Sequence, residues 1–91
     1  LTAVDVQGLG VIRAITEQDI RIPDDVKVIS LTGHAVGGML ETAMTSMEMP
    51  AHEMGKKAAG MLIEEIEAPP DQKPSPQYVT FSTTLVERES T

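Results

Sequence analysis

The pattern of apolar and polar positions predicts a helix, a strand and a short second helix in the first half of the chain. Asp5–Thr16 repeats apolar residues every three or four positions, which is typical of a helix with one buried face. Val26–Leu31 is almost continuously apolar, and this favours a parallel strand covered on both faces. Thr32–Gly38 follows as a loop that opens a short helix through Leu40.

The second half predicts a strand, a long helix and a final strand. Met44–Met49 alternates methionines with polar residues, as a short strand does. Pro50 suits the first position of a helix, and an apolar stripe follows it up to a connector with four prolines, Ala68–Pro76. Tyr78–Val86 is rich in β-branched residues. Helices that alternate with strands predict an α/β fold with crossover connections, and so few strands indicate an incomplete domain.

Composition narrows the possible functions. The chain has 91 residues, of which 41% are hydrophobic, and it has one Phe, one Tyr and no Trp, so its core is aliphatic. A net charge of −7 argues against a nucleic-acid contact made by this segment itself. No cysteine is present, which excludes disulfides and zinc–cysteine sites. No apolar run is long enough to cross a bilayer, and no signal peptide or initiating Met is visible.

Residues for catalysis or metal binding are scarce. The two histidines, His34 and His52, have no nucleophile motif nearby, and His52 has no second metal ligand at helical spacing. The methionines around the second strand are compatible with a soft metal site or with ordinary packing. The sequence therefore predicts a protein that is not an enzyme and holds no cofactor or metal.

Four segments in one order carry a family resemblance. They read A-V-D-V-Q-G-L-G-V-I-R-A-I, I-R-I-P-D-D-V-K-V-I-S, M-T-S-M-E-M-P-A-H-E-M-G-K-K-A-A-G-M-L-I and T-L-V-E-R-E-S. Together they resemble the C-terminal part of the lactose-repressor/galactose-repressor (LacI/GalR) family of bacterial transcription regulators. The resemblance implies part of a two-lobed, periplasmic-binding-protein-like domain with a Rossmann-like, mainly parallel sheet. It places residues 1–47 in the C-terminal lobe, has 48–82 cross to the N-terminal lobe, and returns with 83–91.

The same resemblance implies a function for the whole regulator. Family members bind operator DNA through an N-terminal helix-turn-helix, which is absent from this chain, and hold a sugar or purine effector between the lobes. The protein would then be a cytoplasmic homodimer that controls carbohydrate use. Leu9 and Leu40 are candidates for the dimer interface, and the alternative is that both are ordinary core residues.

The candidate effector site lies where the first strand ends and the first helix begins. Val4 and Asp5 stand where the family commonly has Asn-Asp, and Thr32 stands where it often has an acidic residue. An effector recognised through Thr32, the backbone at Gly33 and His34 is expected. The loss of the acidic residue would make a sugar phosphate easier to tolerate. The T-G-H turn itself resembles that of regulators of disaccharide use, of sucrose or trehalose type. Ligands bind at this end of the strands in open α/β sheets. The alternatives are that Asp5 only caps or charges the helix and that the loop is a plain turn with His34 in solvent.

A second class of function shares this fold. A periplasmic-type sugar-binding transport protein would have the same two lobes, but a signal peptide would replace the helix-turn-helix at the start of the full gene. The R-E-S ending and the I-P-D-D-V turn favour the regulator.

Overall fold

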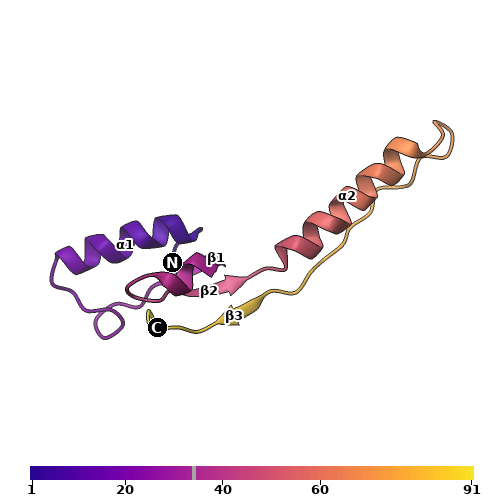
Figure 1. The fold of residues 1–91 in the computed structure, drawn as a ribbon. Helices are drawn as coiled ribbons and strands as arrows, with labels where there is room; N and C mark the ends of the chain where they lie inside the picture. The colour runs from indigo at the N-terminus through magenta and orange to yellow at the C-terminus, as the bar shows by residue number, and fades with distance from the viewer. Residues whose placement is uncertain (34) are drawn as a thin grey trace. The chain divides into compact units, whose positions relative to one another are not determined.

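The computed structural model describes residues 1–33 and 35–91, without the side chains of residues 35 and 36. Its elements follow the predicted order (Figure 1). They are α1 (Asp5–Glu17), β1 (Ile29–Gly33), the 3-10 helix η1 (Ala35–Met39), β2 (Thr45–Glu48), α2 (Ala51–Glu67) and β3 (Thr84–Val86). The chain divides into two compact units, residues 1–49 with 83–91, and residues 50–82.

The sheet of the first unit is small and mixed. Its order is β1-β2-β3, with β1 parallel to β2 and β2 antiparallel to β3. Thr2 adds a single parallel bridge to Ser30 on the free edge of β1. The last strand is antiparallel because the chain leaves the unit at the end of β2 and re-enters beside it, so that Glu48 pairs with Thr84. The α/β fold class is confirmed.

Two strands begin later than predicted. β1 starts at Ile29 because the residues before it are bonded elsewhere: the backbone N–H of Val26 donates to the carbonyl of Arg21, and the N–H of Val28 donates to Ser90. β3 covers only Thr84–Val86, since a strand is limited by its partner and β2 has four residues. Apolar, β-branched composition alone does not show where pairing begins.

The core of the first unit lies between α1 and the sheet. Ile12, Val28 and Met44 are buried there. Gly8 of α1 faces Met44, and a Cβ at Gly8 would overlap the Met44 thioether. The helix can therefore approach the sheet closely only because residue 8 has no side chain.

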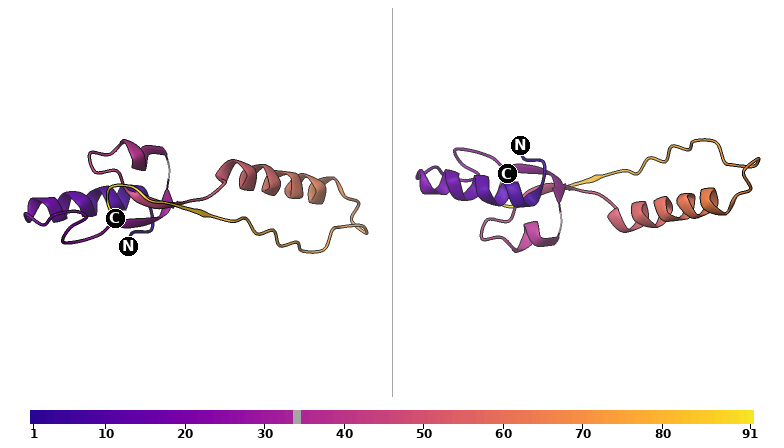
Figure 2. Two further views of the ribbon diagram at one scale, coloured as in Figure 1. Left: turned by 90° about the horizontal axis from the view of Figure 1, so that it is seen from below. Right: turned by 90° about the horizontal axis from the view of Figure 1, so that it is seen from above.

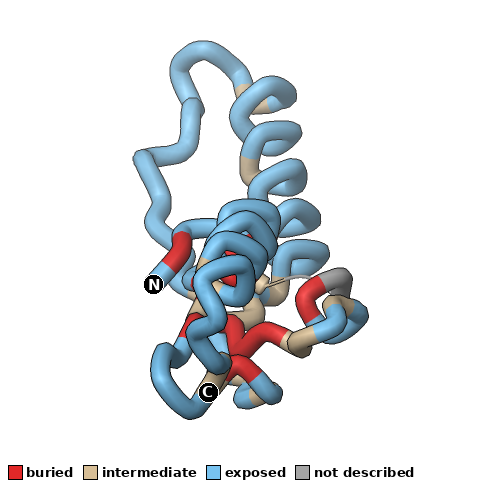
Figure 3. Tube along the Cα trace, turned by 90° about the vertical axis from the view of Figure 1, so that its left-hand side faces the viewer, coloured by how far each residue is buried: buried red, intermediate tan, exposed pale blue. Residues whose placement is uncertain are grey.

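The second unit has no buried core of its own among the described residues. No residue of α2 is buried, and Leu62, Ile63 and Ile66 are exposed (Figure 3). The chain then returns in extended form alongside the helix (Figure 2). Half-buried Phe81 of this segment and Met61 of α2 line the same groove. Among the described helices, none has the length and apolar character needed to span a membrane.

Candidate functional site

The carboxyl end of β1 is hydrogen-bonded to the start of the chain. The Thr32 hydroxyl donates to the Ala3 carbonyl at 2.7 Å, and the Ser30 hydroxyl donates to the Thr32 carbonyl at 3.0 Å. The backbone of Thr2 accepts from Leu31 at 2.9 Å and donates to Ile29 at 2.8 Å. These bonds hold the segment before α1 beside the end of β1, as the candidate site requires.

Asp5 lies in the first turn of α1 with 7% of its surface exposed. It is not the N-cap: that position is Val4, which makes no side-chain cap bond. The Asp5 carboxylate instead faces Gly37 of η1, where a Cβ would lie 3.2 Å from Oδ2. A carboxylate in the first helical turn is still favourably placed against the helix dipole. Asp5 therefore belongs to the same corner of the unit as the loop after β1.

Gly33 is needed for a close approach between strands. It pairs with Glu48 across an irregularity in the β1–β2 ladder. A Cβ on Gly33 would overlap the side chain of Ser46. No described glycine has a positive φ, so space and not backbone conformation requires glycine here. His34, the remaining predicted site residue, lies outside the described residues.

The structure adds Arg88 to this corner, a residue to which the sequence assigned no role. Its side chain is 18% exposed, and its Nη1 donates to the Met44 carbonyl and the Ser46 hydroxyl, both at 2.9 Å. Its Nη2 forms an ion pair of 2.6 Å with Glu48. An arginine next to the end of the last strand was the only signal for this role in the sequence.

The residues after Arg88 bind β2 and the residue that precedes β1. The Ser90 hydroxyl accepts from the Thr45 backbone N–H at 2.8 Å and donates to the Val28 carbonyl at 2.6 Å. The Thr45 hydroxyl lies 2.6 Å from that of Thr91. The Glu89 carboxylate accepts from the backbone N–H of Ala43 at 3.0 Å. The R-E-S ending is thus part of the sheet's hydrogen bonding.

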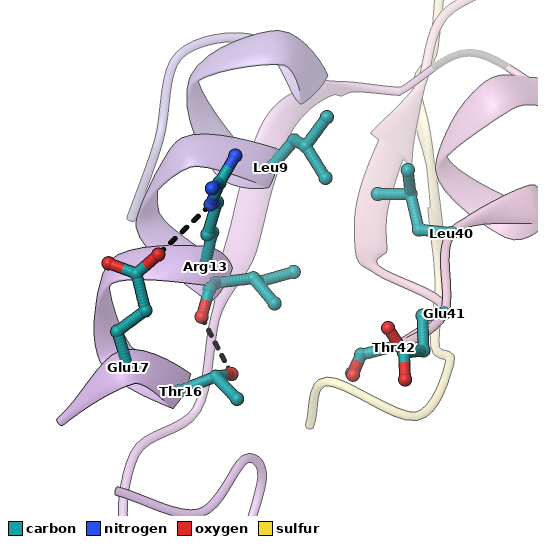
Figure 4. Close-up of a pocket in the computed structure, with 8 residues that line it drawn as sticks. Leu9, Arg13, Thr16, Glu17, Leu40, Glu41 and Thr42 are labelled. Carbon is teal, nitrogen blue, oxygen red and sulfur yellow. Dashed lines mark hydrogen bonds and ion pairs between the residues drawn. The ribbon is translucent and has the colours of Figure 1, made fainter. Parts of the chain in front are cut away.

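A cavity of about 590 Å³ lies between α1 and residues 40–42 (Figure 4). Leu9 and Leu40, the two candidates for a dimer interface, face each other across it. Ile12 also lines the cavity. Leu9 is 49% exposed, while Leu40 is partly buried against the core. The structure therefore places the two leucines together on one accessible, largely apolar surface.

The described residues include no group of three or more His, Asp or Glu side chains arranged to hold a metal ion. Met44, the first methionine of the methionine-rich segment, is fully buried against Gly8 and the core. Packing accounts for that residue.

An α/β unit with a second unit inserted between two of its strands is the architecture of one class of proteins, the periplasmic binding protein-like domains. The profile of the periplasmic binding protein-like domain matches residues 1–91. The chain belongs to this family, and within it to the LacI/GalR-type transcription regulators, so the resemblance seen in the sequence is confirmed.

Individual relatives agree with this assignment. The ribose operon repressor of Halalkalibacterium halodurans is 34% identical over 96% of this chain and 25% of its own length. A solved structure of a transcriptional regulator CelR–cellobiose complex aligns with a TM-score of 0.87 and 30% identity over 98% of this chain and 26% of that one. A LacI family regulator from Arthrobacter sp. FB24 in complex with lactose aligns at 0.79 and 28% identity, covering 97% and 32%. The chain thus spans about a quarter of the length of the curated relatives it matches.

Proposed function

We propose that this chain is the C-terminal part of the effector-binding domain of a cytoplasmic LacI-type transcriptional repressor, and that its effector is a carbohydrate. The observation that carries the proposal is the bond from Thr32 to Ala3, which joins the carboxyl end of the parallel strand β1 to the segment before α1. Residues 1–49 with 83–91 would belong to the C-terminal lobe and 50–82 to the N-terminal lobe. Operator DNA would be bound by a helix-turn-helix outside this chain, and no reaction would be catalysed.

The hydrogen bonds at Thr32 favour a neutral ligand over a charged one. A hydroxyl has one proton, and that of Thr32 is already donated to Ala3, so its oxygen can only accept from a ligand. Sugar hydroxyls can donate to it, whereas a phosphate dianion cannot. Disaccharides of sucrose or trehalose type are therefore preferred at this position over their phosphates.

The names of the relatives favour a regulator over the alternative, a periplasmic-type sugar-binding transport protein. The ribose operon repressor and the CelR and Arthrobacter proteins are all described as repressors or regulators. The second copy of a homodimer would cover the surface formed by Leu9 and Leu40, since an accessible apolar groove of this kind is typical of an interface.

The full-length protein should be titrated calorimetrically with sucrose, trehalose, cellobiose, lactose, ribose and trehalose 6-phosphate. We expect measurable heat for at least one neutral sugar and a lower affinity for the phosphate. Thr32→Val should weaken binding by about tenfold, because it removes both the acceptor and the bond to Ala3. Thr80→Val, an exposed threonine in the second unit, is the matched control. Absence of heat for every neutral sugar would contradict the proposal.

A further inference from the structure

Arg88 follows the strand through which the chain re-enters the first unit and bonds to the strand through which the chain leaves it. Residues 50–82 are inserted between β2 and β3, so β2 is the outgoing connection and β3 the returning one. Arg88 follows β3, and its guanidinium bonds to Ser46 and Glu48 of β2. The arginine thus fixes β2 and the segment after β3 to each other at the point where the second unit is attached.

In space, a single layer of residues separates the same guanidinium from the candidate effector loop. Ser46, which accepts from Arg88, occupies the space that a side chain on Gly33 would need. Glu48, the second acceptor, is the ladder partner of Gly33. A Cβ on Gly38, beyond the loop, would lie 3.4 Å from Nε of Arg88. The residues on either side of the loop, Gly33 and Gly38, therefore lie next to Arg88 or next to the groups that it binds.

We propose that Arg88 is a positioning residue for the effector site: it holds Ser46 and Glu48 against the end of β1 and so sets the geometry of the loop at Thr32 and Gly33. The inference rests on the proposed function of that loop. An arginine is needed because its rigid, planar fork reaches a backbone carbonyl, a hydroxyl and a carboxylate at once. A lysine keeps the charge but has a single nitrogen, so it cannot satisfy all three acceptors in this arrangement.

The test is amide hydrogen exchange on the full-length protein, which needs no ligand. In Arg88→Lys and Glu48→Gln, exchange at Thr32 and Gly33 should be at least threefold faster, while exchange at Ile12 in the middle of α1 is unchanged. Glu87→Gln removes one negative charge from an exposed neighbouring position and should leave every site unchanged. Arg88→Lys should also lower the affinity for any sugar that the wild-type protein binds, by about fivefold.

The outcomes separate the inference from the proposed function. Unchanged exchange at Thr32 and Gly33 would overturn the positioning role. Acceleration by the same factor at Ile12 would also overturn it, because Arg88 would then stabilise the fold as a whole. If the wild-type protein binds none of the sugars but the loop amides accelerate selectively, the positioning role stands and the assignment of the loop to a carbohydrate effector fails.

Discussion

Ser90 donates a hydrogen bond of 2.6 Å to the carbonyl of Val28, a residue 62 positions earlier in the sequence. Its backbone carbonyl accepts from the N–H of the same valine at 2.9 Å. Both residues are buried, so the bonds are shielded from water. The residue before β1 is thereby held by the last segment of the chain and not by a strand of the sheet.

Ser90→Ala should destabilise the first unit by roughly 2–4 kcal/mol. The substitution leaves the Thr45 N–H and the Val28 carbonyl without the hydroxyl that binds both, and a buried polar group without a partner costs about 1–3 kcal/mol. Chemical denaturation of the full-length protein measures the loss. Ser82→Ala, at an exposed serine, is the control. An equal, small effect of both changes would show that water replaces the hydroxyl.

Gly8→Ala and Gly10→Ala should change stability in opposite directions. A Cβ at Gly8 overlaps Met44, which is fully buried and has little freedom to move, so a cost of about 1–3 kcal/mol is expected. No described atom lies within 4 Å of a Cβ on Gly10, and there alanine should stabilise the helix by up to about 1 kcal/mol. Thermal unfolding compares the two variants. In the double variant Gly8→Ala/Met44→Ala the clash is relieved, but only part of the lost stability should return, because the shortened side chain at position 44 leaves a cavity.

Gly33→Ala should disturb the effector loop more than the fold. The new methyl group meets Ser46, which must shift and weaken its bond with Arg88. We expect chemical-shift changes concentrated at Thr32 and in β2, together with a weaker response to sugar. Gly55→Ala, where α2 offers open space among the described residues, is the matched control. Spectra that differ only at residue 33 would contradict this prediction.

The stability of the turn before β1 depends on pH through Asp25. The side chain of Arg21, and then its backbone N–H, hydrogen-bond the carboxylate and lower the pKa of Asp25 below its ordinary value. Because the pKa is depressed in the folded state, the stabilisation is present above the ordinary pKa and is lost as the pH falls through the folded value. Arg21→Gln should raise the pKa of Asp25, measured by NMR titration. An unchanged pKa in this variant would mean that the bond from the backbone N–H alone lowers the pKa of Asp25.

If the full-length protein forms the proposed homodimer through Leu9 and Leu40, Leu9→Arg should shift it toward monomer. Leu9 faces Leu40 across an accessible cavity, and a charge placed there would have to be desolvated on association. Sedimentation velocity over a concentration series should show at least a tenfold weaker self-association. Val11→Arg, an exposed position on the same helix that does not line the cavity, serves as the control. If both variants remain dimeric, the second copy binds elsewhere.

The sequence predicted the helices better than the strands. α1 and α2 follow from residues three and four positions apart, which belong to the helix itself. β1 and β3 depend on partners far along the chain, and a Val-rich stretch such as Val26–Val28 can be bonded to the tail instead. The direction of β3 could not be read from the sequence for the same reason, because it is set by where the inserted unit rejoins the first.

The candidate site was only partly visible in the sequence. The proximity of Asp5 to the loop after β1 came from the family resemblance, and the contact of Asp5 with Gly37 agrees with it. At Gly33 the structure adds a close neighbour that the sequence did not indicate, the side chain of Ser46, while anion binding by the Gly33 backbone stays a prediction. Arg88 could not be found by spacing, since its acceptors lie about 40 residues earlier. Whether Thr32 contacts an effector stays a prediction.

The pairing of Glu48 with Thr84 means that residues 50–82 start and finish at neighbouring points on one ladder. Such an insertion could be removed as one piece. Joining Met49 to Thr83 through a tight hairpin would close the antiparallel pair without changing either strand. Residues 50–82 could therefore be exchanged between relatives while the sheet and the C-terminal tail stay the same. Sequence variation within the insertion need not disturb the fold of the first unit.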